Sequence, residues 1–475
     1  MGDKVRAGGL ALGLWLASAA CAADLSGVMH IKAGRAALEA SDPTRARAEF
    51  RAAVAESAIG ADRLVALVGL GRAEQWLGHY RAALKSFREA RRLAVDTADR
   101  EVADTGAARA LNALEYHQEA LALVAPFAAA SPAATVEVAR AEIALGRPDE
   151  ALRFLAASSA DSTTRTGREL LRETAEAQYE VAARAEAGYS FTHDSDGLTD
   201  RMYSVRTQLP MELGGAGFHT WAVTAATSEV SGSGRSDTFT ELNIGDHVSI
   251  GGKQRLDLRA GLGRAAGWTR FEGLVQWEDR FTDTATLFGS AERAPIVTPV
   301  TLERGLFYDT YSVGTSVRAA DHWMLVPVYF HQEFSDGNQR DGGRIRIVLT
   351  PFDIPRSTSA LGAELEARAY RSTQPSAGIY FNPARYHQEQ IGLIGVHQFA
   401  PGWRIRFTAG AGSETVNGSS ARTWSWALGL TGHLPRNGRL ELHAGRDSFA
   451  SLAGGGSGYW TNGASLTVAW PFSSL

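Results

Sequence analysis

The hydrophobic period of this chain changes once, near Glu186, and that change limits the folds the chain can adopt. Before Glu186 the sequence is rich in Ala, Leu, Glu and Arg, and its apolar residues recur with a period of about 3.6, which predicts amphipathic helices. After Glu186 the period is two, and 37 of the 50 glycines and 9 of the 11 tryptophans lie there. The sequence therefore predicts an α + β multidomain protein, helical over residues 25–185 and β-rich over residues 186–475.

The first residues have the pattern of an export signal. Lys4 and Arg6 precede an apolar run over residues 8–20, which is too short to span a bilayer, and Ala20-Cys21-Ala22 provides a small-x-small cleavage site. We expect a signal peptide over residues 1–22. A retained anchor, or a lipid attached at Cys21, is the alternative. Cys21 is the single cysteine, so its removal would leave a chain without disulfides.

The helical part carries an internal repeat. The large apolar positions Phe50, Phe87, Leu123 and Leu155 are 37, 36 and 32 residues apart, which brackets the 34-residue tetratricopeptide period. The best copy resembles the tetratricopeptide repeat family at its core positions, which are Leu67, Gly71, Gly78, Tyr80, Ala83, Phe87 and Ala90. The resemblance implies stacked helix pairs that dock a protein or polymer partner. An ordinary helical bundle is the alternative.

Strand-like segments in the second part place charged residues on one face and apolar residues on the other. Arg255, Asp257 and Arg259 alternate with leucines, and similar alternation recurs around Arg344, Glu364, Arg404 and Arg439. A soluble β-sandwich with one solvated face would show the same alternation. The alternation alone therefore leaves the choice between a sandwich and a barrel open.

The connections between these segments favour a barrel. Seven short connections lie near residues 214–216, 251–253, 280–283, 319–322, 351–355, 400–402 and 435–438, and between them lie eight longer polar stretches, near Asp194, Ser231, Ala265, Ala294, Ser335, Ser372, Thr415 and Phe449. Such alternation is typical of outer-membrane barrels with periplasmic turns and extracellular loops. Seven turns and eight loops predict a closed antiparallel transmembrane β-barrel of about 16 strands. Trp221, Trp323, Trp403, Trp424 and Tyr459 lie near these connections, as the aromatic residues of membrane interfaces do.

No sequence motif for catalysis or metal binding occurs in the chain. The zinc-binding H-E-x-x-H, the nucleophile elbow G-x-S-x-G and the phosphate-binding loop are absent, and the twelve histidines are scattered. His331 and His387 each begin an H-Q-E triplet, which we interpret as chance proximity on a polar face. We expect no enzyme activity, no cofactor and no metal, although a Ser/His/acid cluster formed on folding is a further alternative. The formal charge of −4, without blocks of like charge, predicts no nucleic-acid partner.

Two predicted loops carry sharper motifs. The first reads Phe334-Ser335-Asp336-Gly337-Asn338-Gln339-Arg340, and the second reads Gly378-Ile379-Tyr380-Phe381-Asn382-Pro383-Ala384-Arg385-Tyr386. Both stretches resemble those of bacterial exopolysaccharide export porins, in particular poly-N-acetylglucosamine export porins, and the second is also similar to a segment of cellulose-export outer-membrane proteins. Generic turn chemistry explains either motif alone.

The resemblance extends to the order of signal peptide, repeats and barrel. It implies an outer-membrane porin that exports an exopolysaccharide, with the helical domain in the periplasm and docked to the proteins that make or modify the polymer. It also implies that a group of loop residues shapes the extracellular mouth or forms a constriction; these are Asp336, Asn338, Arg340, Tyr380, Phe381, Asn382 and Pro383. The alternative is a non-secretory barrel in the lipid of the outer membrane, such as a receptor or a structural protein.

Overall fold

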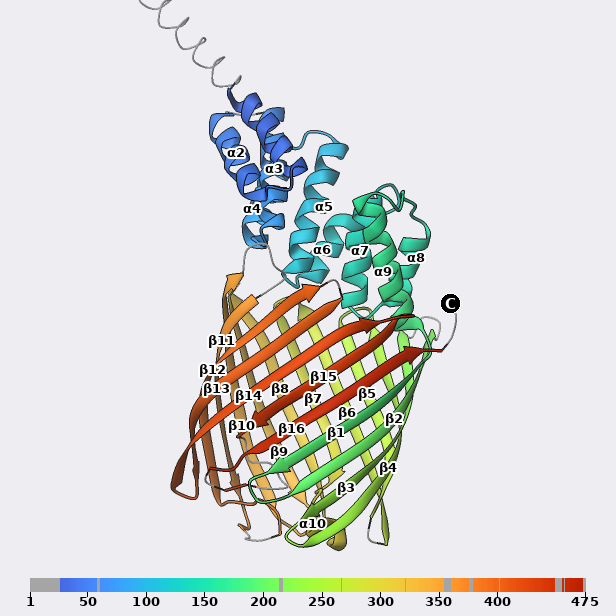
Figure 1. The fold of residues 1–475 in the computed structure, drawn as a ribbon, viewed down its shortest axis with the longest axis vertical. Helices are drawn as coiled ribbons and strands as arrows, with labels where there is room; N and C mark the ends of the chain where they lie inside the picture. Colours follow the sequence, from blue (N-terminus) through green and yellow to red (C-terminus); the bar gives the residue numbers. More distant parts are fainter. Residues whose placement is uncertain are drawn as a thin grey trace, which may run out of the picture. The chain divides into compact units, whose positions relative to one another are not determined.

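The computed structural model describes residues 26–57, 60–212, 217–265, 267–320, 322–353, 360–375, 379–400, 402–448, 455–456 and 458–472. The predicted signal peptide lies outside the described residues. The chain has a helical region followed by a closed antiparallel barrel of sixteen strands, which confirms the predicted fold class (Figure 1). The described residues group into two compact units, one up to Ala141 together with Arg153–Leu171, the other comprising Glu142–Leu152 and the residues from Arg172 onward.

The helical region is a series of short helices joined by tight turns. A helix over residues 26–39 precedes the rest, which are α2 (Pro43–Glu56), α3 (Ala61–Trp76), α4 (Tyr80–Leu93), α5 (Thr97–Ala113), α6 (His117–Val124), the 3₁₀ turn η1 (Ala125–Phe127), α7 (Pro132–Ala144), α8 (Pro148–Ala156) and α9 (Arg165–Val181). Asp42 and Asp96 accept hydrogen bonds from the backbone N–H groups of Arg45 and Asp99, and so begin α2 and α5.

Glycines leave space for the rings of Phe50 and Phe87 between the helices of this region. A Cβ atom added to Gly34 or Gly69 would lie 2.9 or 2.3 Å from the ring of Phe50. One repeat later, a Cβ atom on Gly71 or Gly106 would lie 2.7 or 2.3 Å from the ring of Phe87. Both rings are 1 % exposed. The same packing thus recurs 37 residues along the chain, because only glycine lets the helix backbones approach the rings this closely.

The predicted repeat core lies around α3 and α4. Leu67, Ala83, Phe87 and Ala90 are buried in one cluster, and Tyr80 packs against it half-buried. Gly71 is buried within α3, and Gly78, with a φ of +79°, forms the turn between the two helices. The tetratricopeptide identity of these helix pairs stays a prediction.

Each strand of the barrel pairs with its neighbours in sequence, and β1 pairs with β16 to close the wall. The strands are β1 (Arg184–Asp194), β2 (Thr199–Glu212), β3 (Phe218–Gly232), β4 (Arg235–Ile250), β5 (Gln254–Ala265), β6 (Trp268–Thr282), β7 (Ala285–Pro295), β8 (Phe307–Ala320), β9 (Trp323–Phe334), β10 (Gln339–Asp353), β11 (Ala360–Ser372), β12 (Arg385–Ala400), β13 (Trp403–Val416), β14 (Ser419–Leu434), β15 (Gly438–Asp447) and β16 (Thr461–Pro471). Lipid tails cannot hydrogen-bond backbone groups, and the closed barrel has no unpaired strand edge that would need such bonds.

The strands alternate between two ends of the barrel, which we call the turn end and the loop end. The seven connections at the turn end coincide with the predicted short connections. At the loop end, only residues 296–306, 373–384 and 448–460 form long connections, whereas five of the eight stretches predicted as longer loops are tight hairpins. That part of the prediction is wrong because polar residues such as Ser231 and Thr415 continue the strand pairing instead of leaving it.

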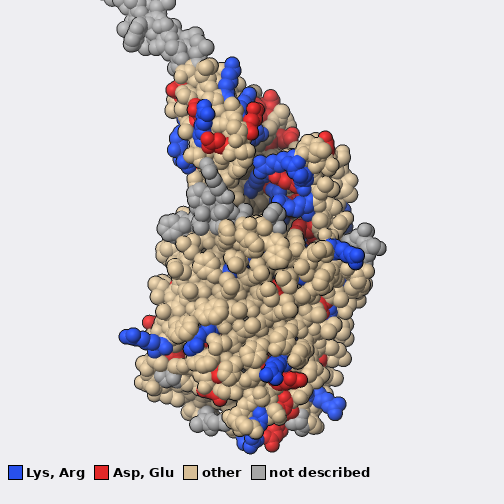
Figure 2. Space-filling model, in the orientation of Figure 1, with Lys and Arg blue, Asp and Glu red and all other residues tan. Residues whose placement is uncertain are grey.

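The middle of the outer wall is apolar, and the charged side chains there face inward. On β5, Leu258 and Leu262 are 39 % and 55 % exposed, and Asp257 and Arg259 alternate with them. Figure 2 shows few charged residues across the middle of the wall that faces the viewer. Trp221, Trp323 and Trp424 are exposed, as interface anchors are. Tyr459 is 4 % exposed and donates to Asp194 at 2.9 Å, so its prediction as an interface anchor is wrong.

Candidate functional site: the lumen and its loop end

The inner wall of the barrel carries charges of both signs. Arg346 and Glu364 lie on the inner face because the residues beside them, Ile345 and Leu365, are exposed on the outer face. Arg346 Nε donates to Glu364 at 2.7 Å. Arg259 pairs with Glu292 at 3.5 Å across the intervening strand β6. A wall of paired charges offers hydrogen bonds to a passing solute without a strong field of one sign.

The two predicted loop motifs meet at the loop end. Asn338, in the β9–β10 turn, donates through Nδ2 to Asn382 at 2.9 Å and to the hydroxyl of Tyr380 at 3.3 Å. Tyr380 in turn donates to Asp336 at 3.0 Å. Burial raises the pKa of Tyr380 to about 12, so the hydroxyl keeps its proton at physiological pH. The sequence motifs therefore form a single hydrogen-bonded network.

Arg340 fixes this network to the barrel wall. Its side chain is 4 % exposed and faces inward, opposite Gln332 in the register with β9. One guanidinium nitrogen donates to the backbone carbonyl of Phe381 at 2.7 Å, and the guanidinium carbon lies 4.4 Å from the centre of the Tyr370 ring. Because Arg340 extends from the inner face, the carbonyl of Phe381 lies on the inner side of the wall. The β11–β12 connection thus folds into the mouth of the barrel.

The β15–β16 connection is held on the same side. Glu414 is fully buried, and it accepts from the backbone N–H of Gly458 at 2.6 Å and from Tyr386 at 3.4 Å. Glu414 lies opposite Gln388 in the register, and Gln388 donates to the carbonyl of Ser448 at 3.5 Å. Both ends of this connection are therefore bound to the inner face of β12 and β13.

The β11–β12 connection touches the other two long connections. A Cβ atom on Gly455, in the β15–β16 connection, would lie 2.3 Å from the ring of Phe381. Tyr380 stacks on Phe334 with 5.1 Å between ring centres, and both pack with Ile296 of the β7–β8 connection. That connection also holds the short helix α10 (Pro299–Arg304), capped by Thr298 and ended by Gly305 at a φ of +62°. The contacts narrow the mouth of the barrel.

The predicted site residues are mostly buried in these contacts. Asn338, Arg340, Tyr380 and Asn382 are 2 %, 4 %, 6 % and 5 % exposed. Pro383 is buried as well, Phe381 is half-buried, and Asp336 is exposed. The side chains therefore hold the loops in position, and what a solute meets is the surface that the loops present.

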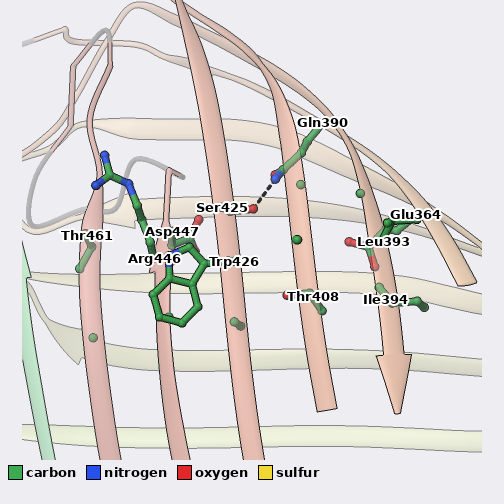
Figure 3. A pocket seen from close by; sticks show the side chains of 16 residues that line it. Glu364, Gln390, Leu393, Ile394, Thr408, Ser425, Trp426, Arg446, Asp447 and Thr461 are labelled. Atoms are coloured by element: carbon green, nitrogen blue, oxygen red, sulfur yellow. Dashed lines mark hydrogen bonds between the residues drawn. The ribbon is translucent and has the colours of Figure 1, made fainter. Parts of the chain in front are cut away.

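A cavity lies deeper in the lumen, in the wall formed by β11 to β16. Its volume is about 330 Å³. Paired glycines recess the wall there, since Gly392 lies opposite Gly410 and Gly445 lies opposite Gly463. Figure 3 shows Glu364, Gln390, Ser425 and Thr461 around it, with a hydrogen bond from Gln390 to Ser425. The recess has polar groups suited to a hydroxyl-rich ligand.

Sequence reasoning missed several residues of this site. Glu414, Gln388 and the helix α10 carry no motif that distinguishes them from other residues of polar strands and loops. The Thr-Pro pair that begins α10 and the glycine that ends it are helix signals that could have located that helix. Tyr386 was within the second motif, but its contact with Glu414 joins residues 28 positions apart.

The histidine triplets lie away from the lumen. In each triplet the glutamine faces inward, and the histidine and glutamate face outward, opposite outward-facing residues of the next strand. His331 contacts Asp341 at 2.8 Å, and His387 contacts Glu389 at 2.9 Å. Among the described residues, no group of three or more His, Cys, Asp or Glu side chains could hold a metal ion.

The comparisons with known proteins concern the fold. No family model and no curated protein matches the chain. Among solved structures, the chain is similar to a bacterial polysaccharide outer membrane secretin, with a TM-score of 0.51 and 12 % identity over 62 % of this chain and 99 % of that one. It is also similar to OmpF of Salmonella typhi in a complex with daunomycin, with a TM-score of 0.35 and 8 % identity over 61 % of this chain and 97 % of that one.

A third similar structure is OccK5 (OpdH) of Pseudomonas aeruginosa, with a TM-score of 0.31 and 10 % identity over 61 % of this chain and 97 % of that one. What these similarities show is the fold: the chain shares a closed antiparallel β-barrel, here of sixteen strands, with a solved outer-membrane protein. In the described part of the chain, no helix combines the length and the apolarity needed to cross a membrane.

Proposed function

We propose that the protein is an outer-membrane porin through which an exopolysaccharide leaves the cell. The observation that carries this proposal is the lumen: a closed barrel with a charge-paired inner wall, and a mouth narrowed by loops that Arg340 and Glu414 hold inside it. A long flexible chain needs a continuous polar path and a limited opening, whereas small solutes need only the path. A similar structure, with a TM-score of 0.51, is named a bacterial polysaccharide outer membrane secretin, which supports the proposal.

The polymer is a poly-N-acetylglucosamine-like or cellulose-like chain by the resemblance of the two loop motifs. Its hydroxyl groups would exchange hydrogen bonds with the wall, including the polar side chains of Gln390 and Ser425 at the recess. The helical domain would lie in the periplasm and dock the proteins that make or modify the polymer. The loop end would then face the outside of the cell.

The test of this proposal is secretion by cells that lack the gene. Deletion is expected to remove the polysaccharide from the medium and the cell surface and to leave it in the periplasm, because the synthase continues to work behind a closed outer membrane. Polysaccharide is measured separately in both compartments, and complementation with the intact gene is the control. Unchanged polymer outside the deletion strain would favour the alternative, a receptor or structural barrel.

A further inference from the structure

Four helices of the helical region carry an arginine at the same place in the repeat, directly after a small residue. The pairs are Gly34-Arg35, Gly71-Arg72, Ala108-Arg109 and Ala139-Arg140. Gly34 and Gly71 face the buried rings of Phe50 and Phe87. Successive helical residues are turned by about 100°, so the arginine after each small residue points away from the ring. We call Arg35, Arg72, Arg109 and Arg140 the arginine row.

The last two arginines of the row already hold carboxylates of this chain. Arg109 Nε donates to Glu137 at 2.7 Å, and Arg140 donates to the same carboxylate at 2.8 Å. A second nitrogen of Arg109 donates to Glu169 at 2.8 Å. Glu137 is fully buried, and its carboxylate pairs with Arg109 and Arg140. Figure 2 shows basic and acidic side chains interspersed on the surface of the helical region.

The first two arginines of the row lack such partners. Arg35 and Arg72 are exposed, and neither makes an ion pair with any residue in the described part of the chain. Partial burial lowers the pKa of Arg72, and the positive charges of Arg109, Arg35 and Arg165 lower it further. The row thus has more positive charge than its own acidic residues balance.

Apolar side chains run beside the row. Val28, Val65 and Val102 each lie seven residues before an arginine of the row, on the same face of the helix two turns earlier. Val102 is 39 % exposed, and Val28 and Val65 are half-buried. A glycan, which has no aliphatic side chains, would gain little from valines. A peptide that bears both carboxylates and apolar side chains would contact the arginine row with the first and the valines beside it with the second.

We propose that Arg35 and Arg72 bind an extended acidic segment of a partner protein. Its carboxylates would pair with these two arginines as Glu137 and Glu169 pair with the other two arginines of the row. Guanidinium groups bind carboxylates in a bidentate geometry, and Arg clusters on repeat surfaces suit acidic motifs. The inference rests on the proposed docking role of the helical domain and names the chemistry of its partner. It does not depend on which solute the barrel carries.

The experiment measures binding to the full chain, purified in detergent, by fluorescence anisotropy. The probe is a labelled peptide in which glutamate alternates with valine and serine, and its control has glutamine in place of glutamate. The test variant is Arg35→Gln/Arg72→Gln. The matched control, Lys85→Gln/Arg92→Gln, removes the same charge from exposed positions of α4. A third variant, Arg35→Lys/Arg72→Lys, keeps the charge without the bidentate geometry. Circular dichroism verifies that every variant keeps its helices.

We expect the glutamate peptide to bind the unchanged chain and to bind Arg35→Gln/Arg72→Gln about tenfold more weakly, with the lysine variant between them and the α4 control within about twofold of the unchanged chain. Binding should weaken with salt. Equal affinity for the glutamine peptide, equal loss in the α4 control, or no effect of Arg35→Gln/Arg72→Gln would overturn the proposal. Tighter binding of polygalacturonate than of the peptide would also overturn it, in favour of an acidic glycan. Because no secretion is measured, failure here leaves the porin proposal standing.

Discussion

Replacement of Ile391 by arginine is expected to destabilise the barrel in lipid by about 2–4 kcal/mol, the cost of a cation near the middle of the hydrocarbon layer. Ile391 is 63 % exposed on the outer wall, near the centre of β12. The neighbouring residue, Gln390, faces the lumen and the cavity beside Glu364. An arginine at position 390 stays in the water of the lumen and next to the Glu364 carboxylate. Gln390→Arg should therefore change the stability by less than about 1 kcal/mol.

The two variants are compared by urea titration of the protein folded in phospholipid vesicles, followed by tryptophan fluorescence. The difference between neighbours is the informative quantity, because both add the same side chain to the same strand. Equal destabilisation by the two variants would mean that β12 does not separate lipid from a watery interior. It would therefore contradict the assignment of the inner and outer faces.

Arg340→Met is expected to release the β11–β12 connection from the inner wall and to increase the conductance of single channels in planar bilayers. Methionine has a similar length but donates no hydrogen bond, so the Phe381 carbonyl loses its 2.7 Å donor. The loss of a buried donor costs about 1–3 kcal/mol, which shifts the balance between the held and the released loop by roughly one to two powers of ten.

The control for this variant removes a lumen charge without removing the anchor. Arg344 lies on the same inner face of β10, opposite Val328, and Arg344→Met takes the same charge from the wall. We expect Arg344→Met to change ion selectivity and to leave the conductance near that of the unchanged protein. Identical conductance of Arg340→Met and the unchanged protein would show that the loop does not narrow the path.

The sequence predicted the barrel well because the residues of each strand themselves indicate its inner and outer faces and where it ends. The leucines of β5 and the glutamates of β11 alternate regularly, and glycine or proline marks the turns, so strand number and connectivity follow from local signals. Buried Phe50 and Phe87 were likewise visible from their spacing.

The arrangement of the loop end could not be predicted in the same way. Asn338 meets Asn382 and Tyr459 meets Asp194 across 44 and 265 residues, and no local pattern specifies such pairs. Residues 448–460 have the glycine- and serine-rich composition of many loops, whereas the position of Gly458 depends on Glu414, which looks in sequence like another strand carboxylate. Tyr459 was misassigned for this reason, since a tyrosine near a strand end serves equally as an interface anchor or as a buried donor.

Blocking the lumen in living cells tests the central claim most directly. The chain has one cysteine, Cys21 in the predicted signal peptide, so single cysteines can be introduced at Gln390, inside the lumen, and at Arg371, exposed at the loop end on the outer face. Both variants are treated with a bulky methanethiosulfonate, and labelling is verified by mass. The account predicts that labelled Gln390→Cys stops polysaccharide secretion while labelled Arg371→Cys secretes normally. Undiminished secretion from cells whose Gln390→Cys is fully labelled would contradict it.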